Sequence, residues 1–177
     1  MDKKIPENVS NLRVYAVEDD KEKIAKEVSV VFCALDMEKD QIKYIENDYA
    51  ALGVAVVSNN SAHRWTQDVP MIIPEINADH LSLIPVQQKN HGWKGFIVPI
   101  PNCTTYGLVC SLAPLHKHFG IKTVVMTSMQ ATSGAGRNGG VLSLDMIDNL
   151  VPYIPKEEEK VENETQKILG VLEGQRI

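Results

Sequence analysis

The stretch Gly95-Phe96-Ile97-Val98-Pro99-Ile100-Pro101-Asn102-Cys103-Thr104-Thr105-Tyr106-Gly107 decides how this 177-residue chain is interpreted. The apolar run at 95–100 predicts a strand, and residues 108–118 predict a helix that leads away from it. Asn102 is placed to cap that helix, because its side-chain oxygen accepts from a free amide of the first turn. Cys103 then opens the helix, where unpaired N–H groups and the helix dipole favour a thiolate and offer donors to an oxyanion. We therefore expect a reactive cysteine, against the alternative of a buried cysteine beside a cap.

Apolar runs that alternate with helical periods predict a parallel α/β sheet over roughly residues 13–130. The run at 28–35 is continuously apolar, as expected of a strand that is covered on both faces, and Asp36 after it is a candidate helix cap. Apolar residues then recur at three- and four-residue steps until Gly53 ends the helix. The strands expected from such runs are 13–17, 28–35, 54–58, 71–74, 95–100 and 122–129.

Further helices are predicted at 142–150 and 157–169, and helical character at 78–89. Pro85 is expected to interrupt the 78–89 segment, and Pro114 to kink the helix that follows Cys103 or to end its first half. The acidic run Glu157-Glu158-Glu159 is interpreted as a solvated helix start, because negative charge suits the positive end of the helix dipole.

Composition excludes several classes of protein. A net charge of −5 argues against an electrostatic nucleic-acid binder, and no apolar stretch approaches the length of a membrane span. Three cysteines without metal-ligand spacing indicate reduced thiols in a cytoplasmic protein, with Cys33 and Cys110 expected in the core. His116 and His118 do not face one way on a helix, and the other histidines are scattered, so no metal is predicted.

Five segments carry a resemblance to a known family. They are PNCTTYGLVCSLAPL (101–115), VSNNSAHRWTQDVPMIIPEIN (57–77), MQATSGAG (129–136), LDMIDNLVPYI (144–154) and EEEKVENETQKILG (157–170). Their order and spacing resemble the archaeal and fungal branch of the aspartate-semialdehyde dehydrogenases, within the phosphorylating aldehyde dehydrogenases. The resemblance covers nearly the whole chain.

The resemblance implies an α/β fold: a parallel, Rossmann-like but incomplete NADP-binding domain at 1–130, with the cysteine helix, and the start of an α+β substrate and dimerisation domain at 131–177. No GxxGxxG turn precedes the first βαβ unit. The family's catalytic histidine and substrate-binding arginine belong to a segment beyond those matched. The chain is therefore expected to resemble a central fragment, inactive when isolated, of an enzyme that forms homo-oligomers.

Site residues follow from the same resemblance. It implies that Cys103 is the nucleophile and that Gln130 lies beside the reacting carbonyl, where a neutral amide positions substrate. Asn102 is open to two roles, that of a helix cap and that of orienting the acyl phosphate.

The cofactor implied is NADP. Leu35 and Asp36 lie at the carboxyl edge of the sheet and are expected to contact it, although Asp36 is equally explained as a cap. Ser133 and Gly134 belong to a loop that the family uses near the nicotinamide, with a plain connecting loop as the alternative. Asn59 and Asn60 are lesser candidates at the sheet edge.

The implied reaction is the reductive dephosphorylation of L-aspartyl 4-phosphate to aspartate 4-semialdehyde, with release of phosphate, through a Cys103 thioester. Two alternatives stay open: a truncated inactive paralogue that binds a full-length subunit, and a reductase of a CoA thioester such as malonyl-CoA. The family continues after SGAG with an aromatic residue and prolines, whereas this chain has Arg137-Asn138-Gly139-Gly140. That departure leaves coenzyme choice and activity open.

Overall fold

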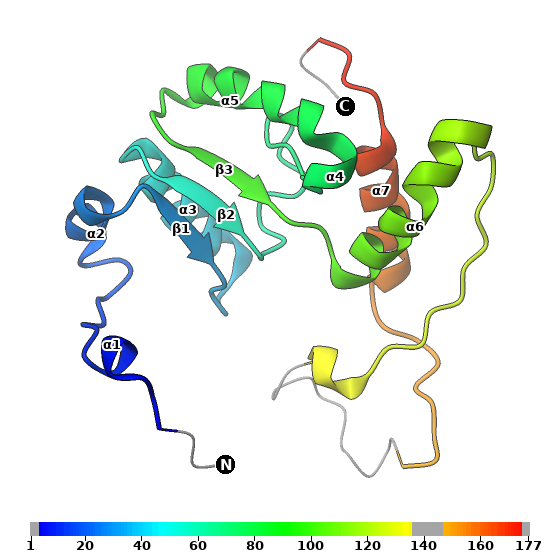
Figure 1. Cartoon of the computed structure of the whole chain (residues 1–177), viewed down its shortest axis with the longest axis horizontal. Helices are drawn as coiled ribbons and strands as arrows, with labels where there is room; N and C mark the ends of the chain where they lie inside the picture. The colour runs from blue at the N-terminus through cyan, green and yellow to red at the C-terminus, as the bar shows by residue number, and fades with distance from the viewer. Residues whose placement is uncertain (1–3, 136–146, 175–177) are drawn as a thin grey trace.

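A parallel sheet of three strands forms the centre of the larger lobe of the molecule (Figure 1). The computed structural model describes residues 4–135 and 147–174. Strands β1 (Val30–Cys33), β2 (Ala55–Ser58) and β3 (Phe96–Pro99) lie in that order and pair in parallel. The register places Val31 opposite Val56, and Val56 opposite Ile97. The predicted parallel α/β fold is confirmed for this part of the chain.

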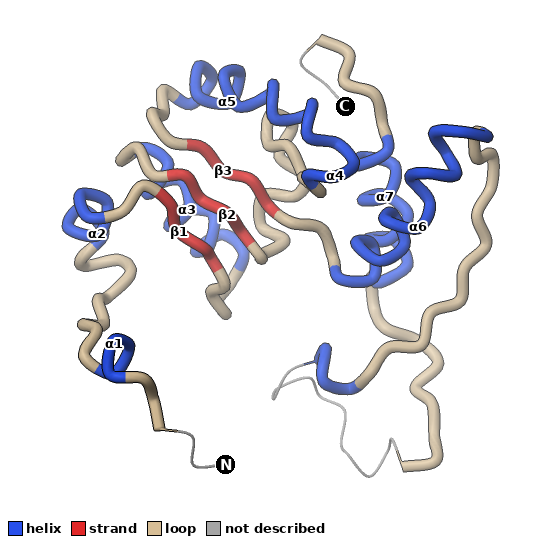
Figure 2. Tube along the Cα trace, viewed as in Figure 1, coloured by secondary structure: helices blue, strands red, loops and turns tan. Residues whose placement is uncertain are grey.

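Helices lie behind the sheet, beside it and beyond its end (Figure 2). Helix α3 lies behind the sheet, α5 runs along the side of β3, and α6 and α7 lie together beyond the end of β3. The helical elements are α1 (Glu7–Ser10), α2 (Lys21–Glu27), α3 (Lys39–Ala51), α4 (Pro74–Asn77), the 3-10 helix η1 (Ala78–Leu83), α5 (Ile84–His91), α6 (Cys103–Phe119), the 3-10 helix η2 (Thr132–Ala135) and α7 (Glu157–Leu169).

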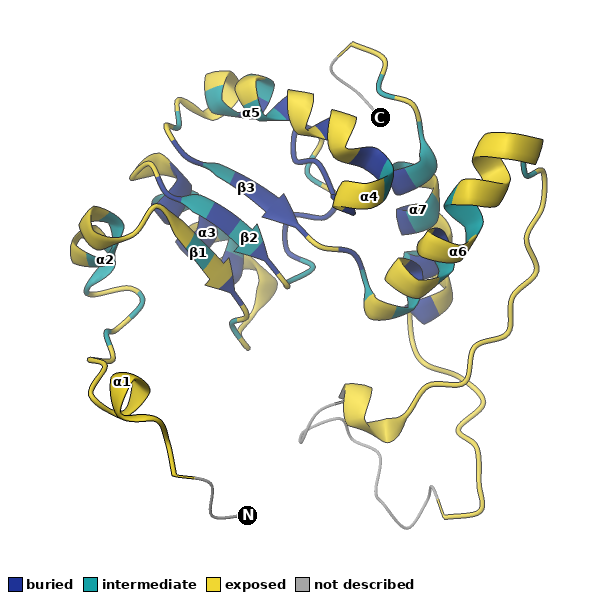
Figure 3. Cartoon of the chain, viewed as in Figure 1, coloured by how far each residue is buried: buried dark blue, intermediate teal, exposed yellow. Residues whose placement is uncertain are grey.

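Buried apolar side chains form two separate clusters (Figure 3). The larger cluster packs one face of α3 against the sheet, and the periodicity of that helix predicts the residues that face inward, such as Ile42, Ile45 and Tyr49. The smaller cluster contains Val109 of α6 and Ile168 of α7. Met71 and Ile73 also contribute to the smaller cluster, so they attach α6 and α7 to the sheet lobe.

Three expected strands are wrong. Residues 13–17 form no strand: Val14 is almost fully exposed, and Val17 is held through its carbonyl by the Tyr49 hydroxyl at 2.9 Å. Residues 71–73 are buried but make only one bond towards β3, from the Ile72 N–H to the Pro99 carbonyl at 3.4 Å, because Pro99 has no N–H to return. Residues 122–129 are exposed and extended, and no described strand pairs with them.

Strand β1 lies at an edge of the sheet, and it is not covered on both faces as expected. Phe32 is 82% exposed and Val30 48% exposed, so an apolar run alone predicted more burial than the structure gives. Asp36 does not cap α3, because the N-cap position is Glu38, which makes no side-chain capping bond.

The two prolines act differently from each other. Pro85 lies in the first turn of α5 and begins that helix instead of interrupting it, as its fixed φ angle allows. Pro114 lies inside α6, which continues to Phe119, so the helix does not end in its first half. The helix expected at 142–150 lies largely outside the described residues, and 147–150 are not helical.

Gly95 lies where two stretches of backbone approach each other closely. Its N–H donates to the Ala50 carbonyl at 2.9 Å, which connects the start of β3 to the end of α3. A Cβ atom at this position would lie 2.1 Å from the Val54 carbonyl oxygen. Because the neighbour is backbone and not the end of a flexible side chain, neither partner can move aside without shifting the sheet.

Replacement of Gly95 by alanine is expected to destabilise the fold by about 3 kcal/mol or more, because the added methyl group overlaps backbone. Gly107, inside α6 with open space around it, offers the matched control, and Gly107→Ala is expected to be neutral or to stabilise by about 0.5–1 kcal/mol. Urea unfolding followed by circular dichroism measures both. A Gly95→Ala protein within about 1 kcal/mol of the parent would contradict the close approach.

Candidate active site

The predicted strand–turn–helix junction is present, and Cys103 is the first residue of α6. Asn102 occupies the N-cap position, and its Oδ1 accepts from the Thr104 N–H at 2.7 Å. Cys103 is exposed to solvent. Its thiol therefore lies at the open end of a capped helix, where a first-turn N–H group without an intrahelical partner favours a charge on the sulfur or on an attached oxygen.

One carboxylate connects the residues around the cysteine. Glu157, the first residue of α7, accepts at one oxygen from the Thr104 hydroxyl at 3.1 Å and from Gln130 Nε2 at 2.9 Å. Its other oxygen accepts from Asn102 Nδ2 at 3.2 Å and lies 3.4 Å from Lys160 Nζ. The structure thus brings Asn102 and Gln130, both predicted from sequence, into one hydrogen-bonded group beside Cys103.

The charge of Glu157 is maintained by these donors. Burial alone would raise the pKa of this carboxyl, but the bonds from Gln130 and Thr104, together with the nearby Lys160 charge, hold its pKa below the usual value. Glu157 is therefore anionic at neutral pH and accepts from every donor that points at it.

The sequence interpretation of Glu157 as part of a solvated helix start is wrong. Glu157 is buried, whereas the neighbouring Glu158 and Glu159 are exposed. The signal in the sequence is the spacing of Glu157, Val161, Glu164 and Ile168, which alternates four- and three-residue steps along one face of α7. Two carboxylates on an otherwise apolar face indicate polar partners inside the fold.

A second carboxylate on this face, Glu164, is 1% exposed. It accepts from Arg64 Nη1 at 2.9 Å and from the backbone N–H of Asn102 at 2.7 Å. Lys167 adds bonds from its Nζ to the carbonyls of Arg64, at 2.8 Å, and Val69, at 3.0 Å. Burial lowers the pKa of Lys167 to about 8. Helix α7 is thereby attached to the loop that follows β2.

Leu35 and Asp36 follow β1 at the carboxyl edge of the sheet, Leu35 partly buried and Asp36 exposed. Behind this edge lies a polar group on α3 and β2. The Ser58 hydroxyl donates to buried Glu46, and His63 Nε2 lies 4.0 Å from the other oxygen of Glu46. Burial raises the pKa of Glu46 and lowers that of His63 to about 4, so their contact is not an ion pair.

Ser133 and Gly134 lie exposed in η2, on the extended part of the chain that follows α6. Figure 1 shows η2 in yellow, apart from the sheet. Among the described residues, no hydrogen bond joins Ser133 or Gly134 to Leu35, Asp36 or Cys103. The departure at 137–140 lies outside the described residues.

The other two cysteines differ from each other. Cys33 is buried as expected, and burial raises its pKa to about 11. Cys110 is exposed, so its assignment to the core is wrong. On α6 it is the neighbouring Val109 that packs into the smaller cluster.

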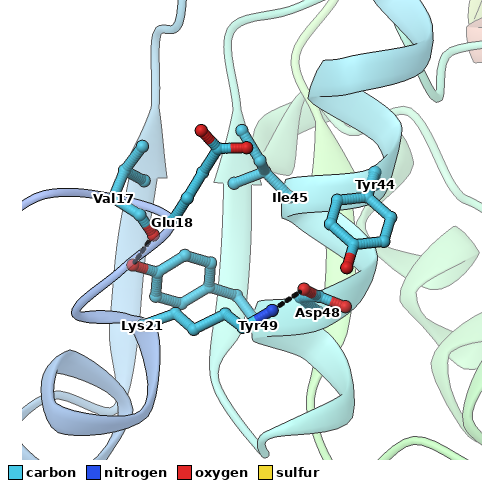
Figure 4. Close-up of a pocket in the computed structure, with 7 residues that line it drawn as sticks. All are labelled: Val17, Glu18, Lys21, Tyr44, Ile45, Asp48 and Tyr49. Atoms are coloured by element: carbon cyan, nitrogen blue, oxygen red, sulfur yellow. Dashed lines mark hydrogen bonds and ion pairs between the residues drawn. The ribbon is translucent and has the colours of Figure 1, made fainter.

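Other kinds of site find little support in residues 4–135 and 147–174. No group of three or more metal-ligating side chains occurs there, and none of the helices there is long and apolar enough to cross a membrane. A shallow hollow between α2 and α3 is lined by residues that include Tyr44, Tyr49 and the Lys21–Asp48 ion pair (Figure 4). Its cavity volume is about 10 Å³, far below the roughly 300–1,000 Å³ of ligand pockets.

Comparison with known sequences matches two family descriptions. "Semialdehyde dehydrogenase, NAD binding domain" covers residues 1–84, and "Semialdehyde dehydrogenase, dimerisation domain" covers residues 112–177. The aspartate-semialdehyde dehydrogenase of Archaeoglobus fulgidus is 50% identical over 85% of this chain and 43% of its own length. That of Saccharomyces cerevisiae is 40% identical over 95% of this chain and 46% of its own length.

A malonyl CoA reductase (NADP) of Metallosphaera sedula is 38% identical over 94% of this chain and 45% of its own length. Among solved structures, aspartate semialdehyde dehydrogenase with NADP from Candida albicans superposes with a TM-score of 0.76 at 34% identity. That superposition covers 98% of this chain and 48% of the other. The chain thus spans about half the length of the curated relatives it matches.

The three thiols are expected to react in the order Cys103, Cys110, Cys33. Cys103 is exposed beside the free N–H groups of a helix start, and Cys110 is exposed two turns into the helix. Cys33 is buried with a pKa of about 11 against an ordinary 9.0, which leaves about a hundredfold less thiolate. Limited iodoacetamide labelling with peptide mapping gives the order. Faster labelling of Cys33 or Cys110 than of Cys103 would refute the assignment.

Glu46 is expected to make stability depend on pH. Because its pKa is raised in the folded state above the ordinary 4.5, its contribution is complete below about pH 4.5 and is lost as pH rises through the folded pKa. Glu46→Gln keeps an acceptor for Ser58 but has no proton to lose. Between about pH 4 and pH 7, the free energy of unfolding of the variant should therefore rise relative to that of the parent. The expected rise is about 1.4 kcal/mol for each unit by which folding raises the pKa of Glu46.

Urea unfolding of both proteins at several pH values measures this difference. Glu162→Gln, which changes an exposed glutamate of α7, is the control and should show no such trend. A parallel pH dependence of the parent and Glu46→Gln would show that burial does not raise the pKa of Glu46.

Proposed function

Because the chain belongs to the aspartate-semialdehyde dehydrogenase family, we propose that it performs the thiol chemistry of an NADP-dependent reduction of L-aspartyl 4-phosphate to aspartate 4-semialdehyde. The observation that carries this proposal is the exposed Cys103 thiol at a capped helix start, beside a carboxylate that holds Asn102 and Gln130 together. The chain matches about half of its relatives' length, so the complete reaction is part of the proposal and not a property of these residues alone.

The Cys103 thiolate acts as the nucleophile. Its sulfur attacks the acyl carbon of the aspartyl phosphate, and the electron pair of the carbonyl moves to oxygen. The free N–H groups of the first turn of α6 are suited to hold that oxyanion. When the carbonyl re-forms, phosphate leaves with the electron pair of the broken C–O bond, and a thioester remains on Cys103. After reduction, the sulfur leaves as a thiolate and releases the aldehyde.

Gln130 and Asn102 orient these steps. The Gln130 amide carries no charge and does not attack the acyl group, and its bond to Glu157 fixes the direction of the side chain. Asn102 uses its oxygen for the Thr104 N–H and its amide nitrogen for Glu157. Its two alternative roles therefore combine in one proposal: the cap that it forms is what presents Cys103 to the acyl phosphate.

The cofactor proposed is NADP, whose reduced form would supply the hydride when it is bound. Leu35 and Asp36 would hold it at the carboxyl edge of the sheet, where exposed polar groups fit a dinucleotide's hydroxyls. Ser133 and Gly134, exposed in η2, would approach the nicotinamide from the other side. The Candida albicans relative was solved with NADP, which supports NADP as the cofactor. The 177-residue sequence contains no glycine-rich phosphate turn.

Several coarser proposals accompany the reaction. The dimerisation-domain match at 112–177 supports a homo-oligomer. We keep the proposed domain boundary at 130/131, with a partial NADP-binding domain before it and the start of the substrate and dimerisation domain after it. A biosynthetic role agrees with the relatives' names, and a cytoplasmic location is proposed with it.

A second candidate, the reduction of malonyl-CoA, is favoured by one observation, the 38% identity to the malonyl CoA reductase of Metallosphaera sedula. It would use the same Cys103 thioester, with a CoA thiolate instead of phosphate as the leaving group. A paralogue without activity that pairs with a full-length subunit is the non-enzymatic alternative.

Acyl transfer to the thiol is the step that tests these alternatives. The chain, incubated with L-aspartyl 4-phosphate, is expected to gain an aspartyl group on Cys103, since this step needs only the thiolate and the positioned acyl carbon. Intact-protein mass spectrometry with peptide mapping detects the adduct. Cys103→Ser is the matched control, and malonyl-CoA in a parallel sample identifies the second candidate.

If malonyl-CoA gives an adduct and L-aspartyl 4-phosphate does not, the second candidate function is supported and the first is refuted. The absence of any adduct on a folded protein whose Cys103 still reacts with iodoacetamide would favour the subunit-binding alternative. Addition of NADPH with absorbance followed at about 340 nm then shows whether the thioester is reduced.

A further inference from the structure

The backbone N–H that precedes Cys103 is held by a buried carboxylate from a distant part of the chain. Glu164, in the third turn of α7, accepts from the Asn102 N–H through Oε2 at 2.7 Å. We propose that Glu164 is a positioning residue for Cys103, because it fixes the Asn102 peptide that presents the thiol. This inference rests on the proposed function only in that Cys103 is the reacting group.

The geometry of Glu164 fits two donors at once. Its other oxygen, Oε1, accepts from Arg64 Nη1 at 2.9 Å, and Arg64 Nη2 donates in turn to the Asn59 carbonyl at 3.3 Å. The side chains of Arg64 and Glu164 are 7% and 1% exposed, so both lie largely out of reach of water as an alternative partner. A buried donor without an acceptor is costly, which makes this carboxylate the determinant of where the Asn102 peptide lies.

The Asn102 peptide in turn decides the geometry of the helix start. Asn102 has the extended backbone of a cap, with φ −56° and ψ 146°, and its oxygen points at the Thr104 N–H. Glu157 holds the side chain of Asn102, and Glu164 holds its backbone. The two glutamates lie seven residues apart on one face of α7, so a single rigid helix fixes both ends of the same residue.

The same contact relates the thiol to the sheet edge. Arg64 belongs to the loop that follows β2, and Lys167 holds the carbonyl of Arg64 at 2.8 Å. Figure 1 shows α7 beside α6, with the sheet lobe on the other side of α4. Glu164 is therefore the point at which the loop after β2, helix α7 and the cap of Cys103 meet.

The alternative is that Glu164 is merely structural, and that its ion pair with Arg64 only keeps α7 in place. Two readouts separate the roles. Removal of a negative charge near a thiol favours the thiolate and speeds alkylation, whereas loss of the cap geometry slows alkylation. General loosening of α6 would change Cys110 on the same helix as well as Cys103, while a local change at the helix start affects Cys103 alone.

The experiment measures the iodoacetamide alkylation rates of Cys103 and Cys110 as a function of pH in the 177-residue chain. In Glu164→Gln we expect the Cys103 rate at neutral pH to fall about three- to tenfold and the pH profile to move upward, because the capped helix start is lost for part of the time. The Cys110 rate should stay unchanged. Glu162→Gln, which removes an exposed charge from the same helix, is the matched control and should match the parent.

Glu164→Asp provides a second variant that keeps the buried charge beside Arg64, in case Glu164→Gln does not fold. Its shorter side chain reaches only one of the two donors, so the Cys103 rate should again fall. An unchanged or faster Cys103 rate in the folded variants, or a joint change of Cys103 and Cys110, overturns the proposal.

This result is independent of the acyl-transfer test. Alkylation needs no substrate, so a chain that forms no adduct with aspartyl phosphate or malonyl-CoA would refute the proposed function and leave the role of Glu164 to be judged by the rates. Conversely, normal adduct formation with unaltered alkylation in the Glu164 variants would refute only the positioning role.

Discussion

Every polar group of Asn102 that matters for the thiol is engaged by a neighbour. Its oxygen accepts from Thr104, its amide nitrogen donates to Glu157, and its backbone N–H donates to Glu164. A cap on an isolated helix is worth about 1 kcal/mol, too little to hold one geometry against thermal motion. Two buried or partly buried charged acceptors strengthen these bonds. The orientation of Cys103 therefore depends on a helix that lies some sixty residues further along the chain, as the contact from Glu164 spans 62 positions.

This dependence explains why the polar contacts of α7 are surrounded by apolar packing. Val109 and Ile168 meet in the smaller cluster, and Ile168 lies on the face of α7 that carries the polar contacts. Burial makes the hydrogen bond that Arg64 donates to Glu164 strong and its loss expensive. Helix α7 has many charged residues and would not be stable by propensity alone. Its buried stripe, which begins with Glu157 in the acidic first turn, accounts for its position.

The sequence predicted those parts of the fold whose signal is local. The run before Cys103, the cap at Asn102 and the bounds of α7 follow from neighbours within one or two turns. It predicted strands at 71–74 and 122–129 that the structure does not contain. An apolar or alternating run can form a strand only where a neighbouring strand pairs with it, and the run itself does not show whether that partner exists. Cys110 and Glu157 were assigned by residue type to the core and to the surface, and the packing of α6 against α7 reverses both.

The contrast between Cys33 and Cys103 shows how position sets thiol chemistry in this fold. Both cysteines lie close to the carboxyl end of a strand of the same sheet. The β1 strand ends inside the cluster beneath α3, where burial and the nearby Glu46 raise the pKa of Cys33 to about 11. After β3 the chain runs on through Pro101 into α6, which carries Cys103 out of the sheet to an exposed helix start. The same chemical group is inert at one strand end and available at the other, because only the second is followed at once by a capped helix.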